Sequence, residues 1–437
     1  MNTLRVGVVC LGRTTFDVQA ARGLYEKTIS ELESMAGVEW IIEKDLVIET
    51  ADAEAAARRL GTSGIDGVII ISGTFHLGHL ALILEREIRR PIMLWAYNEL
   101  PYNGGKIRLN SVCGVNLNAS NLYKAGNDTY FCHVGDAINM DWLAALRMKA
   151  ALHGARIGLV GSRAHGFFNL APDELRVFSE AGALIDYYSP TELWNAVPDR
   201  GLAAQMDEAV GSEFDCSGVT AEQRGKVANL AAVLKEFCDN NRLSALAVRC
   251  WPEFAAQYGI APCAAMSLLQ SRDYLLACEG DAEGALSMLA CRAAGAGTPF
   301  LADLSQVNLD EDFALMWHCG VAPVNLRDGI CACSLDTYFA GGKGVTADFA
   351  MKAGEVSVLR IDSARGKTRL FIAHGNAEHI GKELKGTYAK VRFDRPLRRL
   401  LETVVYNGVA HHVAMVYANH LEAYRIFARI MKWQVIE

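Results

Sequence analysis

The sequence has no long apolar run and no excess of basic residues. Its hydrophobic stretches are shorter than the roughly 18 residues that a transmembrane helix needs. The 43 Lys and Arg residues are outnumbered by 50 Asp and Glu residues, which gives a formal net charge of −7. Nucleic-acid-binding proteins usually carry a basic footprint. We therefore expect no membrane and no nucleic acid as partner. Because the N-terminus is typical of a strand rather than a secretory signal, we expect a cytoplasmic protein.

The sequence also lacks paired Cys-x-x-Cys motifs. Its 12 cysteines are scattered at irregular intervals, and several follow apolar residues, as Cys10 and Cys278 do. This pattern indicates reduced, buried thiols and argues against both a disulfide framework and a structural zinc knuckle. No Gly-x-Gly-x-x-Gly follows the first apolar run, where Cys10-Leu-Gly-Arg13 stands instead. A dinucleotide-dependent dehydrogenase is therefore not favoured.

The order of the expected elements indicates an α/β protein with more than one domain. At 437 residues the chain is long enough for two or three domains. Short apolar runs alternate with helical patterns, which predicts a doubly wound parallel sheet. Expected strands of this first sheet cover residues 6–10, 38–42, 67–71 and 92–95.

A second unit of the same kind is expected after a helix near residues 141–154. Its strands are predicted at 156–160, 183–188, 245–250, 274–278 and 299–302. The last hundred residues are richer in glycine and in alternating segments, which indicates a C-terminal antiparallel β domain resembling a small barrel. We expect an N-terminal α/β domain over 1–140, a second α/β domain over 141–335, and a β domain over 336–437.

Two carboxylates follow neighbouring apolar runs in the second unit. Glu279 comes directly after one predicted strand, and Asp303 comes directly after the next. If these strands are parallel neighbours, both carboxylates lie at the carboxyl edge of the sheet, where ligands bind in open α/β folds. Two adjacent carboxylates repel each other unless a cation or a shared proton joins them. The alternative is that each is an ordinary helix cap or loop acid.

Three histidines could complete a site with these carboxylates. His318 lies between an apolar stretch and a glycine, and His411 and His412 are adjacent. Neighbouring residues of an extended segment point opposite ways, so at most one of His411 and His412 should face a given metal. An oxygen-rich set with one or two imidazoles suits Mn²⁺ or Mg²⁺, with Co²⁺ as a further possibility. Each histidine could instead be an ordinary core or loop residue.

Taken together, these motifs resemble the L-fucose isomerase and L-arabinose isomerase superfamily of metal-dependent aldose–ketose isomerases. The chain is most similar to the shorter, fucose-isomerase-like members, and the similarity extends over essentially its whole length. It is most specific where a Cys-Glu-Gly-Asp segment, a later Asp and a late His-His pair occur together. The matching stretches are 113–120, 159–167, 249–253, 277–281, 300–303, 317–320 with 322–323, and 410–412.

The resemblance implies a metal site and an oligomer. It implies that Glu279, Asp303 and His412 bind a divalent ion, usually Mn²⁺. Arabinose isomerases use an additional histidine, which His318 matches here, so His318 could bind either the metal or the substrate. Active sites of the family are built partly from a neighbouring subunit's first domain, so a homo-oligomer, hexameric or trimer-based, is expected. The candidate substrate contacts are His411, Arg13, Phe16, His76 (expected to be exposed at a strand end), Trp95, Asn116, Arg163 and Trp251.

By this resemblance we expect an aldose–ketose isomerase that acts on a free, 6-deoxy or 6-substituted sugar through a cis-enediol. Of Glu279 and Asp303, one would take the C2 proton and the other would manage the proton at C1. A metal lowers their pKa values and mutual repulsion raises them, so one can be poised near neutrality. Arg13, Arg108 and Arg163 could bind an anionic substituent, or they could be surface ion-pair partners.

Two other functions remain open at this point. A sugar epimerase or lyase could use the same metal-assisted enediolate chemistry, since the same residues would serve it. A non-catalytic sugar-binding protein would also fit two α/β domains around a cleft. That function would leave the carboxylate pair and the His-His segment without a purpose.

Overall fold

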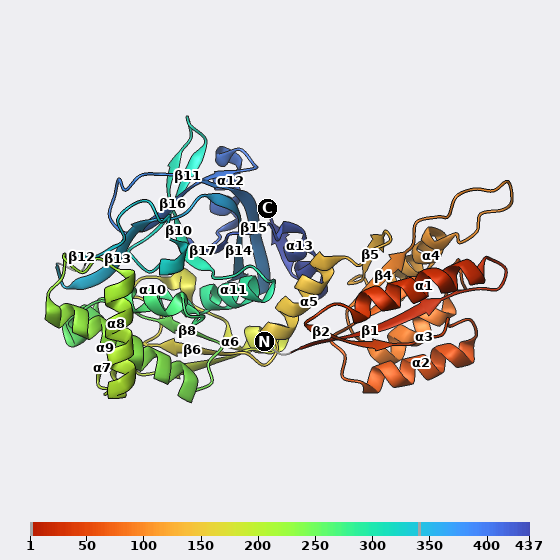
Figure 1. Ribbon diagram of the computed structural model, residues 1–437, viewed down its shortest axis with the longest axis horizontal. Helices are drawn as coiled ribbons and strands as arrows, with labels where there is room; N and C mark the ends of the chain where they lie inside the picture. The colour runs from red at the N-terminus through yellow and green to blue at the C-terminus, as the bar shows by residue number, and fades with distance from the viewer. Residues whose placement is uncertain (1–2, 340–341) are drawn as a thin grey trace. The chain divides into compact units, whose positions relative to one another are not determined.

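The computed structural model describes residues 3–339 and 342–437. The chain forms two compact units (Figure 1). Unit 1 comprises Met1–Ala150 with Arg429–Lys432, and unit 2 comprises Ala151–Ala428 with Trp433–Glu437. The three-part division after residues 140 and 335 stays a prediction. Among the described residues, no helix is long and apolar enough to span a membrane.

Unit 1 is a doubly wound α/β fold. All its strand pairs are parallel, and the strand order is β2-β1-β3-β4-β5. The central strands β3 and β4 are buried throughout, which explains their continuous apolar sequences. The strands are β1 (Leu4–Leu11), β2 (Val38–Ile42), β3 (Gly67–Ser72), β4 (Ile92–Ala96) and β5 (Phe131–Val134). The helices are α1 (Val18–Glu33), α2 (Thr50–Thr62), α3 (His79–Ile88), α4 (Ser111–Lys124) and α5 (Met140–Leu152).

Unit 2 begins with a second parallel sheet, in the order β7-β6-β8-β9. Its strands are β6 (Arg156–Val160), β7 (Leu184–Tyr188), β8 (Ala245–Val248) and β9 (Leu276–Ala277). The helices are α6 (Glu174–Ala181), α7 (Thr191–Trp194), α8 (Arg200–Glu213), α9 (Ala221–Asn240), α10 (Cys263–Gln270) and α11 (Ala282–Ala293).

The rest of unit 2 is an antiparallel barrel of six strands, which closes where β15 pairs with β16. Its order is β16-β11-β10-β17-β14-β15, with β13 and β12 extending it beyond β16 and β18 lying beside β15. The strands are β10 (Phe300–Asn308), β11 (Phe313–His318), β12 (Ser334–Phe339), β13 (Gly344–Ala350), β14 (Gly354–Ala364), β15 (Lys367–Glu378), β16 (Thr387–Phe393), β17 (His412–Val416) and β18 (Gln434–Ile436), with helices α12 (Leu397–Asn407) and α13 (Leu421–Met431).

The predicted fold class, two parallel-sheet α/β parts followed by an antiparallel barrel, is confirmed. One strand assignment is wrong. The segment at 299–302 was expected to lie beside the strand at 274–278 in the parallel sheet, but it is the start of β10, which pairs with β11 and β17 in the barrel. The apolar run alone could not distinguish the two, because a buried strand has the same pattern in either sheet.

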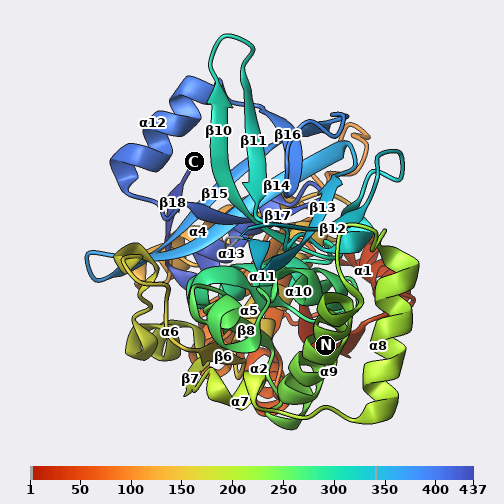
Figure 2. The same cartoon turned by 90° about the vertical axis from the view of Figure 1, so that its left-hand side faces the viewer.

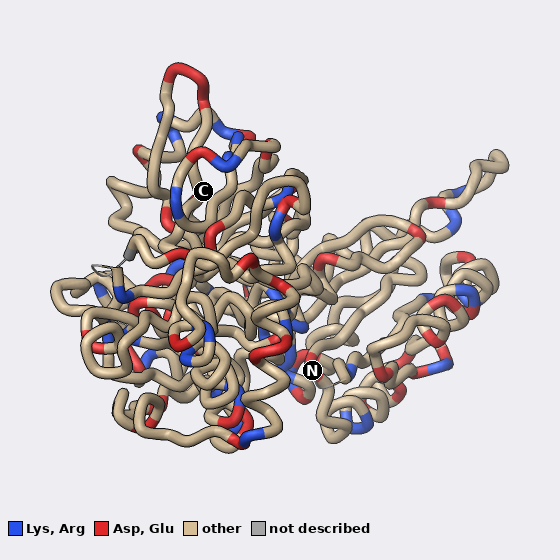
Figure 3. Tube along the Cα trace, turned by 60° about the vertical axis from the view of Figure 1, so that its left-hand side comes forward, with Lys and Arg blue, Asp and Glu red and all other residues tan. Residues whose placement is uncertain are grey.

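Helix α11 connects the two sheets of unit 2. It packs against β8 of the parallel sheet and against β14 and β17 of the barrel (Figure 2). Nearly all of its residues are buried, and one hydrophobic core runs from β6 and β8 through α10 into the barrel. The loop before α11 is therefore held between the parallel sheet and the barrel. Acidic and basic residues are interspersed along the described chain rather than gathered in one stripe (Figure 3).

Candidate active site

The loop between β9 and α11 carries the first carboxylate in an unusual backbone conformation. Glu279 has φ of 62° and Gly280 has φ of 71°, so both lie in the left-handed region. A Cβ on residue 280 would lie 2.2 Å from the carbonyl oxygen of Ser162, so only glycine fits there. Asp281 then caps α11 by accepting from the Gly284 amide at 2.8 Å. Strained non-glycine backbone of this kind is concentrated at functional sites.

The barrel brings the second carboxylate and the histidine pair to the same place. Asp303 on β10 is the register partner of His412 on β17. The Nε2 atom of His412 lies 3.3 Å from an oxygen of Glu279 and 3.5 Å from an oxygen of Asp303. The Nε2 atom of His411 lies 3.6 Å from the same Glu279 oxygen. The structure thus gathers Glu279, Asp303 and both histidines from three separate elements.

The two carboxylates therefore meet, but not for the reason given by the sequence. They were expected at one edge of a parallel sheet, whereas Glu279 follows β9 of that sheet and Asp303 lies on β10 of the barrel. The expectation that only one of the adjacent histidines faces the site is also wrong. His411 sits in a bend before β17, outside the alternating strand geometry, so its ring can turn towards Glu279 beside that of His412.

His318, at the end of β11, completes the group. Its ring centre lies 5.5 Å from that of His412. Ligand atoms of Glu279, His318 and His412 lie within 4.8 Å of one another, and so do those of Asp303, His411 and His412. The Nδ1 atom of His318 accepts the backbone N–H of Cys319 at 2.9 Å. In its neutral form His318 therefore carries its proton on Nε2.

A buried ion-pair chain fixes the orientation of His412. Its Nδ1 lies 2.9 Å from the carboxylate of Asp281, which also pairs with Arg360 on β14. All three side chains are completely buried. Because Asp281 accepts the Nδ1 proton, the other ring nitrogen of His412, Nε2, faces Glu279 and Asp303. The sequence did not reveal Arg360, since its strand shows nothing that marks a buried arginine.

The histidines control the ionisation of the first carboxylate. Burial raises the pKa of Glu279, but hydrogen bonds from His411 and His412 outweigh it and hold the pKa below its ordinary range. The expectation that one of the two carboxyls is poised near neutrality when a metal is bound stays a prediction. Burial lowers the pKa of His412, but hydrogen bonds to Asp281 and Glu279 outweigh it and raise the pKa to about 9.

The donor set fits the divalent cation that the family resemblance implies. The Nε2 atom of His318 is buried and has no hydrogen-bond partner among the described residues. The Nε2 atom of His412 faces the carboxylates of Glu279 and Asp303, and a divalent cation bound there would take the place of the proton on this nitrogen. Carboxylate oxygens with imidazole nitrogen suit Mn²⁺ better than a thiophilic ion.

The loop after β6 and a tryptophan line the same group in unit 2. Trp251 donates its indole N–H to Glu279 at 3.3 Å. The Ala164 amide donates to the Glu279 carbonyl at 3.0 Å, and the Phe167 ring lies 5.3 Å from that of His411. The guanidinium of Arg163 lies over the Phe168 ring, and no carboxylate pairs with Arg163 within the described part of the chain.

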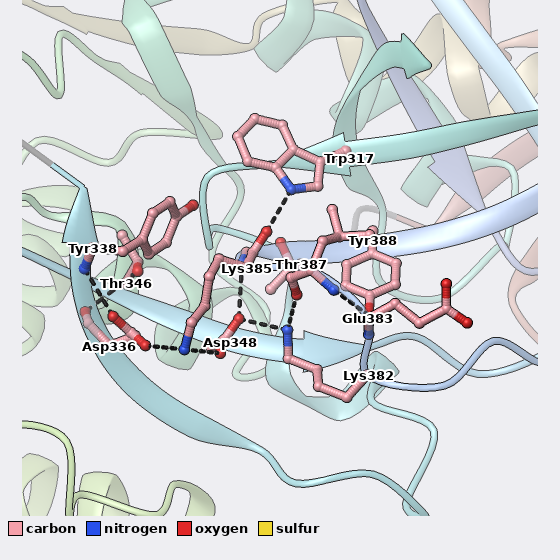
Figure 4. Close-up of polar contacts among 12 residues, drawn as sticks. Trp317, Asp336, Tyr338, Thr346, Asp348, Lys382, Glu383, Lys385, Thr387 and Tyr388 are labelled. Carbon is pink, nitrogen blue, oxygen red and sulfur yellow. Dashed lines mark hydrogen bonds and ion pairs between the residues drawn. The ribbon is translucent and has the colours of Figure 1, made fainter. Parts of the chain in front are cut away.

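Lys382 and Lys385, in the loop before β16, are paired with carboxylates (Figure 4). The ammonium of Lys382 lies 2.7 Å from Asp348, and that of Lys385 contacts Asp336 and Asp348. The carbonyl of Lys385 also accepts the indole N–H of Trp317 at 2.8 Å. These contacts tie the loop before β16 to β12 and β13, and they neutralise both lysines.

The remaining candidates lie in unit 1. His76 and Trp95 are completely buried, so the expected exposure of His76 is wrong. Its ring is held by the Ser72 hydroxyl at 3.0 Å, and the indole N–H of Trp95 donates to the Gly135 carbonyl at 2.7 Å. The other four candidates are at least partly accessible to solvent. Arg13 and Phe16 are partly buried, and Asn116 is exposed. Arg108 forms an ion pair with Asp17 at 2.8 Å.

Glu283, next to this chain of ion pairs, provides a test of the electrostatics. Burial raises its pKa to about 7, an effect only partly offset by Arg360. Its carboxyl is thus harder to ionise when folded, and stability should fall as pH rises from about 4.5 to 7. We expect Glu283→Gln to exceed the wild type in free energy of unfolding by about 1–3 kcal/mol at pH 8 and to match it near pH 4.5. Urea titrations at both pH values measure this, and equal stability at pH 8 would contradict the assignment.

Comparison with known proteins identifies the family. The N-terminal domain model of fucose/sulfoquinovose isomerases matches residues 7–137, and the C-terminal domain model of L-fucose isomerases matches residues 324–437. Proteins named sulfoquinovose isomerase are similar over nearly the full length. The one from Priestia megaterium is 26% identical over 97% of this chain and 96% of its own, and that from Alkalicoccus urumqiensis is 26% identical over 98% of each.

A solved structure of a periplasmic solute-binding protein from Actinobacillus succinogenes, with bound D-allose, matches at 12% identity. It covers 58% of this chain and 81% of its own, and its TM-score of 0.18 is too low to support any argument. The two domain models and the full-length relatives agree with each other and with the gathered carboxylates and histidines. The chain therefore belongs to the fucose/sulfoquinovose isomerase family and is a sugar isomerase of the aldose–ketose class.

Proposed function

We propose that the enzyme interconverts an aldose and a ketose that carry an anionic group at C6, through a cis-enediol and with a bound divalent cation. The observation that carries this proposal is the cluster of Glu279, Asp303 and His412, with Arg163 unpaired on the adjoining loop. The relatives named for the sulfonated sugar sulfoquinovose support the choice of an anionic substrate.

Glu279, Asp303 and His412 would hold the cation, and Mn²⁺ is the ion we favour. When bound, a divalent cation supplies Lewis-acid polarisation of the sugar carbonyl and charge stabilisation of the enediolate. His318 has a different role in this proposal. Because its Nδ1 accepts a backbone N–H, its Nε2 proton is free to be donated to a sugar oxygen.

The two carboxylates would move the protons. Glu279 is held ionised by His411 and His412, so it can accept a proton from C2 at neutral pH. Asp303 lies on the other side of His412 and would exchange the proton at C1. Trp251 holds one oxygen of Glu279 by its indole N–H, which leaves the second oxygen to the histidines and the substrate.

The route of the proton can be tested in D₂O. In an enediol mechanism the transferred proton passes through a carboxyl group that exchanges with solvent, so the product gains deuterium at the carbon that receives it. We expect NMR of the product to show solvent deuterium at C1 of the ketose. A hydride shift would leave that carbon without deuterium, and such a result would exclude the proposed roles of Glu279 and Asp303.

Arg163 would recognise the anionic group. Arginine binds sulfonates and phosphates by paired charge-assisted hydrogen bonds, and the guanidinium of Arg163 lies over the Phe168 ring with no carboxylate partner among the described residues. We expect Arg163→Gln to lower kcat/KM for the sulfonated sugar by about 10–100-fold, since a charge-assisted hydrogen bond contributes about 1.5–3 kcal/mol. The 6-hydroxy sugar of the same stereochemistry should be turned over equally by both proteins.

The matched control for this prediction is Arg156→Gln. Arg156 begins β6, the strand that leads to the Arg163 loop, but its guanidinium pairs with Asp186 at 2.7 Å. The Arg156→Gln variant should keep the wild-type ratio of kcat/KM between the sulfonated and the 6-hydroxy sugar. If Arg163→Gln lowered kcat/KM equally for both sugars, Arg163 would support the loop and would not bind the anionic group.

We also propose a homo-oligomer in which unit 1 contributes to a neighbouring subunit's site. The exposure of Asn116 and the partly exposed Arg13 are compatible with this role. Light scattering coupled to gel filtration should give a mass that is a multiple of the 47.6 kDa chain.

A further inference from the structure

Four cysteines that are far apart in sequence meet beneath the active site. They are Cys250 after β8, Cys263 at the start of α10, Cys278 after β9, and Cys319 after β11. All four are buried, with exposed fractions between 0% and 5%, and all are free thiols. We call them the thiol cluster.

The sulfur atoms form two close pairs, and three of them make up one compact group. Those of Cys250 and Cys278 are 3.1 Å apart, and those of Cys263 and Cys319 are 3.6 Å apart. The sulfurs of Cys263, Cys278 and Cys319 all lie within 4.8 Å of one another. Zinc with four thiolates at about 2.3 Å in a tetrahedron places the sulfurs roughly 3.8 Å apart. The two measured separations are 0.2 to 0.7 Å shorter than that value, so the sulfurs would move apart slightly around an ion.

We propose that Cys250, Cys263, Cys278 and Cys319 bind one thiophilic metal ion of the zinc type, separate from the catalytic cation. Simple core packing does not require four neighbouring cysteines, since a thiol is a weak hydrogen-bond donor and other small apolar side chains would pack there as well. Four convergent thiols without a disulfide are instead the ligand set of closed, structural zinc sites.

The position of the thiol cluster suggests what the ion would do. Three of its members directly adjoin residues of the active site: Cys250 precedes Trp251, Cys278 precedes Glu279, and Cys319 follows His318. The cluster also joins the parallel sheet, α10 and the barrel. A bound ion would therefore hold the site's side chains in place and contribute to folding, because structural metal binding is coupled to folding.

The first test uses the wild-type chain, expressed in zinc-supplemented medium and dialysed against EDTA to strip weakly bound ions. Elemental analysis should then find one zinc per chain. Titration with an organomercurial in the presence of a zinc-indicator dye should release that zinc as four thiols react. Zinc absent from the dialysed protein, with no uptake on refolding with Zn²⁺, would overturn the proposal.

Variants separate the thiol cluster from the catalytic site. Cys250→Ser removes one of the four proposed ligands, so after EDTA dialysis this variant should retain less than about a tenth of the wild-type zinc. Cys291→Ser, at a buried free cysteine outside the cluster, should keep it. Glu279→Gln should also keep the zinc, although it should lose the catalytic ion. Equal zinc loss in Cys291→Ser, or zinc loss in Glu279→Gln, would contradict a separate thiolate site.

A spectroscopic measurement covers the case in which Cys250→Ser does not fold. Wild-type protein refolded with Co²⁺ in place of zinc should show the intense visible bands of tetrahedral cobalt bound by thiolates, together with sulfur-to-cobalt charge transfer. If the spectrum showed weak bands of oxygen- and nitrogen-bound cobalt and no thiolate bands, the cobalt would occupy the catalytic site alone. That result would overturn the proposal.

Discussion

Replacing Glu279 with glutamine is expected to lower kcat by at least roughly 10²–10⁴-fold, the range for loss of a general acid–base group. The amide keeps the size of the side chain but can neither accept the C2 proton nor offer a charged ligand. Its hydrogen bond from Trp251 can persist, so the fold should remain intact. Steady-state isomerisation assays with saturating Mn²⁺ measure the effect, and circular dichroism checks the fold.

Glu283→Gln is the matched control for that loss. It makes the same chemical change four residues later, at a buried carboxyl that contacts Arg360 and the Ser363 amide rather than the catalytic group. Its kcat should stay near the wild-type value. Near wild-type turnover in Glu279→Gln, or an equal loss in Glu283→Gln, would rule out Glu279 as the proton-transfer group.

The largest expected effect on stability belongs to Asp281. Its carboxylate is completely buried between Arg360 and His412. Asp281→Ala would remove the closer of the two carboxylates that contact the buried Arg360 guanidinium and leave only Glu283, 3.7 Å away. Breaking a buried pair in this way costs about 3–5 kcal/mol. Burial raises the pKa of Asp281, but Arg360 and His412 outweigh it and hold the pKa below its ordinary range. The carboxylate is therefore charged in the folded protein at neutral pH.

A double-mutant cycle separates the ion pair from general damage to the core. Arg360→Met combined with Asp281→Asn should be destabilised by less than the sum of the two single changes, because the double variant no longer buries the arginine charge. Asp281→Asn can still cap α11 and accept from His412. Urea denaturation of the four proteins gives the coupling energy. Additive losses in the cycle would show that Asp281 and Arg360 do not depend on each other.

The sequence predicted the fold class because the period and order of its apolar segments are local properties. It failed where the answer depended on which sheet a strand joins. The apolar run at 299–302 is compatible with a strand of a parallel sheet or of a barrel. Asp303 was therefore expected beside Glu279 at the edge of the parallel sheet, whereas it reaches Glu279 from the barrel. The His411–His412 pair was expected to diverge, but a bend before β17 turns both rings inward.

Residues whose role depends on burial were the hardest to foresee. His76 follows a strand end, where exposure is common, yet the chain covers it completely. Arg360 lies in an alternating strand that gives no sign of a buried charge. The thiol cluster escaped prediction because metal motifs are recognised by short spacing, and Cys250, Cys263, Cys278 and Cys319 are separated by 13, 15 and 41 positions. Only the fold brings them together.

The most direct test of the account is to incubate the purified, Mn²⁺-loaded wild-type enzyme with sulfoquinovose and follow the sugar by ¹³C NMR. An EDTA-treated sample and Glu279→Gln serve as the two controls. The account predicts a new signal from the quaternary C2 of the cyclic ketose in the loaded wild type and none in either control. Conversion that persists at the wild-type rate in Glu279→Gln, or a product that is an epimer or a cleaved fragment, would contradict it.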